Sequence, residues 1–175
     1  AVKKVTFINP ITGSENSSIT SFILYPAKHY MTDPSKHKDV FDQIRTDLVV
    51  RTRALKKMGK NLEAQRLEQR VTYDLEMIEE IGYVKGIENY SRYFDGRDPG
   101  ASPYTLLDYF TEPYGSNWLC VIDESHMTFP QIRGMYQGDR SRKQTLIDYG
   151  FRLPAALDNR PLKFDEYLRR IPNFI

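Results

Sequence analysis

The chain has 175 residues, with 25 lysines and arginines against 23 aspartates and glutamates. Its 40% hydrophobic and 13% aromatic content is too rich for a disordered chain, and its length fits one domain or two small ones. No apolar run reaches the roughly 20 residues that a membrane helix needs, and a single cysteine excludes an internal disulfide and a multi-cysteine zinc site.

The charge and the first residue set two further expectations. A net charge of +2 neither demands nor forbids nucleic acid. Ala1 stands in place of methionine and no secretory leader precedes the fold, which indicates a processed protein or a piece excised from a longer one. We therefore expect a soluble, reduced, cytoplasmic chain with no membrane contact.

The first residues predict a β-hairpin. Val5–Ile8 and Ile19–Tyr25 are apolar and β-branched runs, and the polar turn residues Gly13–Ser18 lie between them. Pro26 should end the second strand because proline has no amide hydrogen to donate to a ladder.

Two long helices are predicted next. Thr32–Pro34 combines a capping side chain with a proline suited to a first helical turn. Apolar and small side chains then recur every three or four residues, with a break at Gly59 and an end at Gly82. The periodic positions are Phe41, Ile44, Leu48, Thr52 and Leu55, then Leu67, Val71, Leu75 and Ile78. Helices joined by so short a link should lie antiparallel and bury these faces against each other.

The remainder predicts mixed structure. Glycines and prolines favour loops and short turns over 83–104, followed by a short helix over 104–110 and a turn over 112–117. Trp118–Ile122 is a continuous apolar run, typical of a parallel strand that is covered on both faces. Helices are predicted over 129–149, ended by Gly150, and over 164–171.

Asp123 and Glu124 directly follow the predicted strand. Ligands of open α/β sheets bind beyond the carboxyl ends of the strands, where an aspartate can hold magnesium and a glutamate can polarise water. With His126 two residues later, this is the pattern of a DExH box. The alternative is an ordinary strand that runs into a polar loop. The partner loop Gly-x-x-x-x-Gly-Lys-Ser/Thr is absent, because Gly59-Lys60 is followed by Asn61. The acids either do something else or form half of a nucleotide site whose other half lies outside this chain.

Longer motifs resemble the UvrB family of the UvrABC excinuclease over nearly the whole chain. They are Leu62–Arg70, Tyr73–Met77, Gly86–Arg92, Pro103–Phe110, Pro130–Tyr136, Gly138–Arg140, Arg142–Gln144, Gly150–Pro154 and Ala156–Leu162. They keep the family's order and approximate spacing, which makes the resemblance more specific than any single box.

The resemblance implies an α/β fold, as part of a RecA-like P-loop helicase motor domain. Residues 1–26 would end the UvrA-interaction domain, 27–102 would be a helical insert, and 103–175 would be the later part of the first motor domain. It implies a bacterial, cytoplasmic protein of nucleotide excision repair that verifies damaged DNA with ATP and partners UvrA and UvrC. Asp123 would hold the magnesium of ATP, Glu124 would activate water and His126 would couple the nucleotide state to another surface. The fragment alone is expected to be inactive and to hold no cofactor. The alternative is a non-catalytic module that binds DNA or protein.

The resemblance also suggests DNA-binding residues. Between Arg133 and Arg152 there are five basic and two acidic residues with aromatic rings interleaved, a pattern of single-strand binding or simply of a solvated basic helix face. The resemblance favours the first interpretation for Phe151, Arg152, Arg133 and Arg142. It also places three earlier residues near DNA, namely Arg70, Tyr83 and Glu88. Glu88 would contact a base edge or repel a misplaced backbone. The alternative for Arg70 is a helical salt bridge to Asp74.

Overall fold

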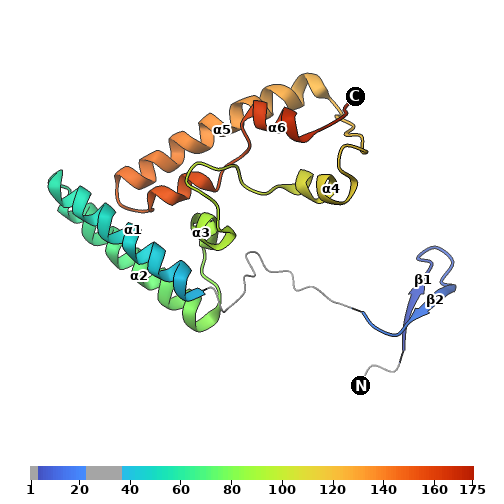
Figure 1. Ribbon diagram of the computed structural model, residues 1–175, viewed down its shortest axis with the longest axis horizontal. Helices are drawn as coiled ribbons and strands as arrows, with labels where there is room; N and C mark the ends of the chain where they lie inside the picture. Colours follow the sequence, from blue (N-terminus) through green and yellow to red (C-terminus); the bar gives the residue numbers. More distant parts are fainter. Residues whose placement is uncertain (1–3, 23–36) are drawn as a thin grey trace.

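The computed structural model describes residues 4–22 and 37–175. These residues form a two-stranded antiparallel sheet and a mostly helical body (Figure 1). The elements are β1 (Val5–Ile8), β2 (Glu15–Ile19), α1 (His37–Lys57), α2 (Asn61–Ile81), η2 (Ile87–Tyr90), α3 (Ser91–Asp95), α4 (Leu106–Tyr114), α5 (Ser125–Asp148), η3 (Pro154–Asp158) and α6 (Phe164–Arg170). The predictions for residues 23–25 of the second strand, for Pro26 and for the Thr32–Pro34 cap lie outside the described residues. Within the described ranges no helix is long and apolar enough to cross a bilayer.

The hairpin is confirmed, but its second strand is earlier than predicted. β1 pairs with β2 from Val5 opposite Ile19 to Ile8 opposite Glu15. The side-chain oxygen of Asn9 accepts hydrogen bonds from the amides of Ile11 and Thr12, at 2.8 and 3.2 Å. This Asx turn closes the connection early, so the polar run pairs with β1 and residues 20–22 lie outside the strand.

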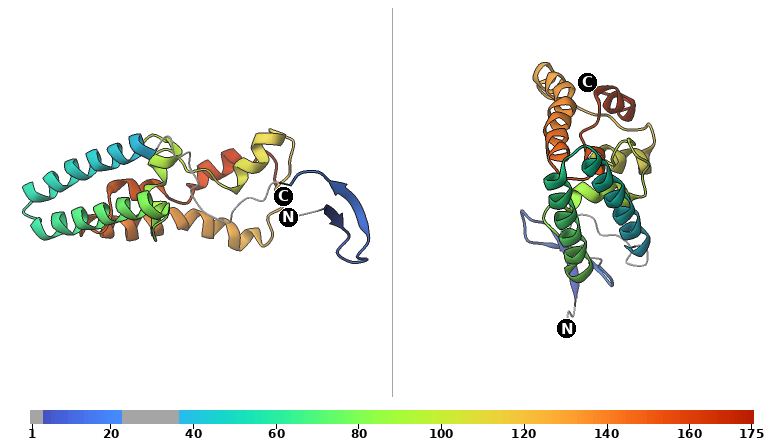
Figure 2. Two further views of the ribbon diagram at one scale, coloured as in Figure 1. Left: turned by 90° about the horizontal axis from the view of Figure 1, so that it is seen from below. Right: turned by 90° about the vertical axis from the view of Figure 1, so that its left-hand side faces the viewer.

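The antiparallel helix pair is confirmed. α1 and α2 lie side by side in both views of Figure 2, and the predicted positions make their shared core. Gly59 and Gly82 adopt the left-handed conformation at φ +76° and +75°, which glycine enters without steric cost. The central side chains of the core are the fully buried Ile44, Leu55, Leu67 and Val71.

Residues 83–104 are more ordered than predicted, because η2 and α3 occupy 87–95. Two tyrosines with buried rings anchor these short helices to the pair. The Tyr90 hydroxyl donates to Asp74 at 2.8 Å, and the Tyr93 hydroxyl donates to Asp47 at 2.6 Å. Burial and the adjacent carboxylate raise the pKa of each tyrosine. Long-range hydrogen bonds therefore order a stretch whose glycines predicted loops.

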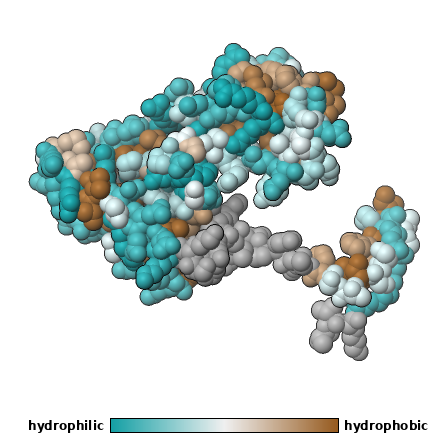
Figure 3. Space-filling model, in the orientation of Figure 1, coloured by the Kyte–Doolittle hydropathy of each residue, from teal (hydrophilic) through white to brown (hydrophobic). Residues whose placement is uncertain are grey.

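The prediction of a buried strand over Trp118–Ile122 is wrong, because the described residues form no strand there. Cys120 forms one isolated parallel bridge to Phe174, while Leu119 and Val121 are 54% and 70% exposed. The nearby Phe174 and Ile175 are also exposed, and brown side chains gather at this end of the molecule in Figure 3. In the described residues the run lies beside the C-terminal end of the chain, with Phe110 packed on Trp118, and no strand of the β1–β2 sheet pairs with it.

Helix boundaries differ at two further places. α5 begins at Ser125 and contains Pro130, whereas the prediction began it at Phe129. α4 continues through Pro113 to Tyr114, so the first half of the predicted turn over 112–117 is helical and the chain turns at Gly115. The helix near the end of the chain is confirmed as α6, and η3 was not predicted.

Basic side chains of the helix pair cap the C-terminal end of α5. Arg51, Lys60 and Arg66 donate to the carbonyls of Ile147, Asp148 and Tyr149 at 3.4, 3.2 and 2.8 Å, respectively. The last carbonyls of a helix have no partner within it, and cations are favourable at its negative end. These three bonds dock α5 on the pair.

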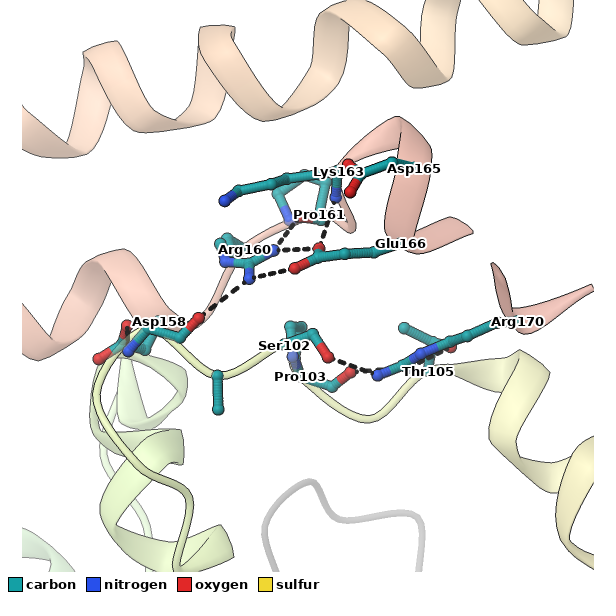
Figure 4. A network of polar contacts seen from close by, with 12 residues as sticks. Ser102, Pro103, Thr105, Asp158, Arg160, Pro161, Lys163, Asp165, Glu166 and Arg170 are labelled. Carbon is teal, nitrogen blue, oxygen red and sulfur yellow. Dashed lines mark hydrogen bonds and ion pairs between the residues drawn. The ribbon is translucent and has the colours of Figure 1, made fainter. Parts of the chain in front are cut away.

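Three arginines hold the extended segment 96–105, which joins α3 to α4. Arg97 donates to the carbonyl of Ala101 at 3.1 Å. Arg160 donates to the carbonyl of Gly100 at 3.2 Å, and Arg170 to that of Pro103 at 3.0 Å (Figure 4). The arginines supply the partners that backbone carbonyls outside regular structure require.

Carboxylates orient all three arginines, and Asp95 accepts from Arg97 at 3.0 Å. Glu166 accepts two hydrogen bonds from Arg160 at 2.7 and 2.9 Å, and Asp108 accepts one from Arg170 at 2.7 Å (Figure 4 shows the first pair). The pKa of Glu166 is lowered from 4.5 to about 2, mainly because Arg160 donates these hydrogen bonds to its carboxylate.

Replacement of Gly150 by alanine should strongly destabilise the fold. Its φ is +72°, and an added Cβ would lie 2.2 Å from the Glu63 carbonyl oxygen. We expect a loss of roughly 2–4 kcal/mol in the free energy of unfolding, measured by urea denaturation. Gly138→Ala is the matched control, because that helical position is open and alanine should stabilise it by up to about 1 kcal/mol. Equal effects of the two changes would contradict the close packing at Gly150.

Glu166 should make folding stability depend on acid pH. A carboxylate whose folded pKa is depressed adds stability above its unfolded pKa of 4.5, and that stability disappears as the pH falls towards 2. The shift corresponds to at most about 3 kcal/mol, and screening by solvent lowers this contribution. Glu166→Gln should flatten the urea-unfolding profile between pH 5 and 2 and destabilise the protein at pH 7.

The matched control for Glu166 is its neighbour on α6. Asp165→Asn removes an exposed ion pair and should change the free energy of unfolding by less than about 1 kcal/mol. A pH profile of the Glu166→Gln variant that runs parallel to that of the wild type would refute the role of Glu166.

Candidate functional site

Asp123 and Glu124 lie at the entrance to α5. The Glu124 amide donates to Asp123 Oδ1 at 2.9 Å, and the Thr128 hydroxyl donates to the Asp123 carbonyl at 3.0 Å. Glu124 has a φ of +47°, the one positive value among non-glycine residues in the described ranges. Such a backbone costs about 1–3 kcal/mol.

His126 lies beside Glu124. Its Nδ1 is 3.3 Å from Glu124 Oε2, and the two side chains are 72% and 68% exposed. An exposed pair of this kind contributes little to stability because water and salt screen it. All three residues of the predicted box therefore meet at the first turn of α5 and face solvent.

A basic cavity of about 300 Å³ brings together three of the predicted DNA residues. Glu88 comes from η2, Arg142 from α5, and Arg152 from the turn that follows α5. Lys143 and Arg160 line the same cavity and were not predicted. Four cations against Glu88 and Asp139 give the cavity a positive charge, which suits a phosphate.

Arg70 forms the salt bridge that was its alternative interpretation. Its Nε is 3.0 Å from an oxygen of the buried Asp74, and its Nη2 donates to the Lys85 carbonyl at 3.1 Å. The pair is partly buried. Removal of Arg70 would therefore leave a buried carboxylate without its cation, held by the hydrogen bond from the Tyr90 hydroxyl. A structural role is thus established for Arg70, and its DNA role stays a prediction.

Tyr83 and Phe151 present exposed rings. They are 47% and 43% exposed, and the Arg66 guanidinium lies 4.4 Å from the centre of the Phe151 ring. Arg66 was not predicted, because its role depends on contacts with Tyr149 and Phe151 from the far end of α5. The stacked cation adds positive charge beside a ring on which a base can stack.

Arg133 lies apart from this cavity. It faces α6, with its guanidinium carbon 4.5 Å from the centre of the Phe164 ring. Of the predicted DNA residues, Glu88, Arg142 and Arg152 thus line the basic cavity, whereas Arg133 lies on another part of α5.

The chain is similar to known proteins over nearly its whole length. Residues 35–96, which contain α1, α2, η2 and α3, match the UvrB third helical domain family. The chain is 53% identical to "UvrABC system protein B" of Chloroflexus aggregans over 170 residues, which are 97% of this chain and 25% of that protein. It is 52% identical to the protein of the same name from Symbiobacterium thermophilum over 174 residues, 99% of this chain and 26% of the relative. For the Thermus thermophilus relative the identity is 47% over 174 residues, 99% and 25% of the respective lengths. The chain spans about a quarter of the length of these relatives.

Proposed function

The chain belongs to the UvrB family, and we propose that it contributes to the verification of damaged DNA in bacterial nucleotide excision repair. The observation that carries the proposal is an identity of about 50% over nearly every residue to proteins named for the UvrABC system. By the same likeness, damaged DNA, UvrA and UvrC are the proposed partners, and the later part of the chain is proposed to belong to a RecA-like motor in the longer protein.

Asp123 and Glu124 are proposed to serve ATP hydrolysis in that longer protein. Asp123 would hold the magnesium ion, whose ligands are typically one or two carboxylates together with the nucleotide's phosphates and water. The exposed carboxylates at the start of α5 fit this ligand set, since Asp123 Oδ2 has no protein partner within the described ranges. Magnesium would neutralise charge on the phosphates.

Two residues of the chain would activate the water and transmit the nucleotide state. The Glu124 carboxylate, which is 68% exposed, would accept a proton from the attacking water. His126, 3.3 Å from Glu124, would respond to the charge of that carboxylate and pass the change to another surface.

The role of Glu124 can be tested in a chimera in which this chain replaces the matching quarter of the Thermus thermophilus relative. Glu124→Gln keeps the shape of the side chain and removes the base. We expect ATP turnover to fall by about 10²-fold or more while ATP binding is retained. Glu112→Gln changes another exposed carboxylate, on α4, and should leave turnover unchanged. Undiminished turnover in the Glu124→Gln chimera would exclude the proposed role.

A non-catalytic binding module is the second candidate for the chain on its own. It is favoured by the sequence, which lacks the phosphate-binding loop that the acids would need. ATP turnover by the 175-residue chain, if it were above background and lost in Asp123→Asn, would exclude this candidate.

The basic cavity and the Phe151 ring are proposed to contact DNA. Phe151→Ala with Arg152→Ala should weaken binding of a single-stranded oligonucleotide by about tenfold or more, because one stacked base contributes about 1–3 kcal/mol. Fluorescence anisotropy at about 50 and 200 mM salt would show a shallower salt dependence for the variant. Val50→Ala with Arg53→Ala removes one apolar and one cationic side chain from α1 as the control. Unchanged binding by the first variant would remove Phe151 and Arg152 from the DNA path.

A further inference from the structure

A second basic surface lies between α5 and α6, outside the basic cavity. Four side chains at helical spacing share one face of α5, and two side chains come from the start of α6. We call this the α5–α6 groove; its residues are Arg133, Tyr136, Gln137, Arg140, Lys163 and Phe164. It continues into a neighbouring hollow that shares Tyr136, Arg140 and Lys163, and the two measure about 390 and 230 Å³. Asp139 and Arg160 line both this hollow and the basic cavity, so the groove adjoins that cavity.

Two cations of the groove contact aromatic rings. The Arg133 guanidinium carbon is 4.5 Å from the centre of the Phe164 ring, and Lys163 Nζ is 5.4 Å from that of Tyr136. Phe164 is fixed in turn by an edge-on contact with Phe129 at 5.7 Å. A guanidinium that stacks on a ring keeps the N–H donors of its edge available to a further ligand.

The cations of the groove lack carboxylate partners. Within residues 4–22 and 37–175, neither Arg133, Arg140 nor Lys163 forms an ion pair with a side chain. The acids nearby are committed elsewhere: Asp139 binds Arg142 and Lys143 at 3.0 and 2.8 Å. Likewise Asp165 binds Arg169 and Glu166 binds Arg160. The groove therefore keeps three positive charges that form no direct ion pair with a carboxylate in the described ranges.

We propose that the α5–α6 groove binds the phosphodiester backbone of a DNA strand. Arg133 and Arg140 are seven residues apart, about 10 Å along the helix, which is the span of about three successive phosphates on one strand. Arginine suits phosphate because its planar edge can donate two parallel hydrogen bonds. The inference rests on the proposed DNA function and extends it to Tyr136, Arg140 and Lys163, in a groove separate from Phe151 and Arg152.

The test removes the three charges from the intact 175-residue chain. The groove variant carries Arg133→Gln, Arg140→Gln and Lys163→Gln. The control variant carries Arg53→Gln, Lys56→Gln and Lys57→Gln, which removes the same charge from exposed positions of α1. Circular dichroism melts check that both variants keep the wild-type fold. Binding of a labelled single-stranded oligonucleotide is measured at about 50 and 200 mM salt.

The groove variant should bind at least about 20-fold more weakly at about 50 mM salt, and the control should change less than about threefold. Three phosphate contacts on a single strand give a slope of about −2 in a plot of the logarithm of the affinity against the logarithm of the salt concentration. The wild-type affinity should therefore fall about 20-fold more than that of the groove variant between the two salts. An abasic oligonucleotide should show the same difference, because the groove reads the backbone.

Four outcomes would overturn the proposal. Equal losses in both variants would mean that overall charge, not the groove, attracts DNA. Displacement of the oligonucleotide by polyglutamate at equal charge concentration would point to an acidic protein, and displacement by inorganic phosphate or ATP at about 1 mM would point to a free anion. No binding by the wild-type chain at the lower salt would also overturn it, since the chain contains the whole groove.

Different results would refute the groove proposal and the proposed function. Wild-type binding by the groove variant, together with weak binding by the Phe151 and Arg152 variant, would refute the groove alone. ATP turnover in the chimera does not involve the groove, so loss of the Glu124 effect would refute the catalytic proposal alone.

Discussion

Positively charged side chains that donate to backbone carbonyls connect the separate parts of this structure. Arg51, Lys60 and Arg66 bind the last carbonyls of α5, and Arg97, Arg160 and Arg170 bind those of segment 96–105. A hydrogen bond from a charged donor contributes about 1.5–3 kcal/mol, roughly twice a neutral one. The helix pair has its own apolar core, which Leu153 and Ala155 join, and these six side chains add directed bonds that fix the segments after α3 relative to that core.

The partners of each cation distinguish structural from available charges. Arg160 and Arg170 each have both a carbonyl and a carboxylate partner, so little of their hydrogen-bonding capacity remains for a ligand. Arg140 and Lys163 line the same hollow as Arg160 and have no acidic partner in the part of the chain that the structure describes. Basic residues of similar sequence context thus divide into those that build the fold and those free to bind an anion.

The helix pair could be predicted because its signal is local: Ile44, Leu48, Leu67 and Val71 repeat at helical spacing and share one core. Trp118–Ile122 misled the prediction because continuous apolarity indicates burial but does not say which strands provide it. α3 was missed because Tyr93 is ordered by Asp47, 46 residues earlier. At the candidate sites, the box residues are adjacent in the chain and could be found, whereas Lys163 meets Arg140 only through the packing of α6 on α5.

The glycine contact at the end of α5 has a mechanical consequence. Gly150 touches the backbone of Glu63 without an intervening side chain, while Asp123 and Glu124 stand at the opposite end of the same helix. With 24 residues, α5 is a rod roughly 36 Å long. A tilt of about 5° around the glycine would move the acids by about 3 Å, comparable to the length of a hydrogen bond. A small rotation of α5 about this tight contact would therefore produce a much larger displacement of the two carboxylates.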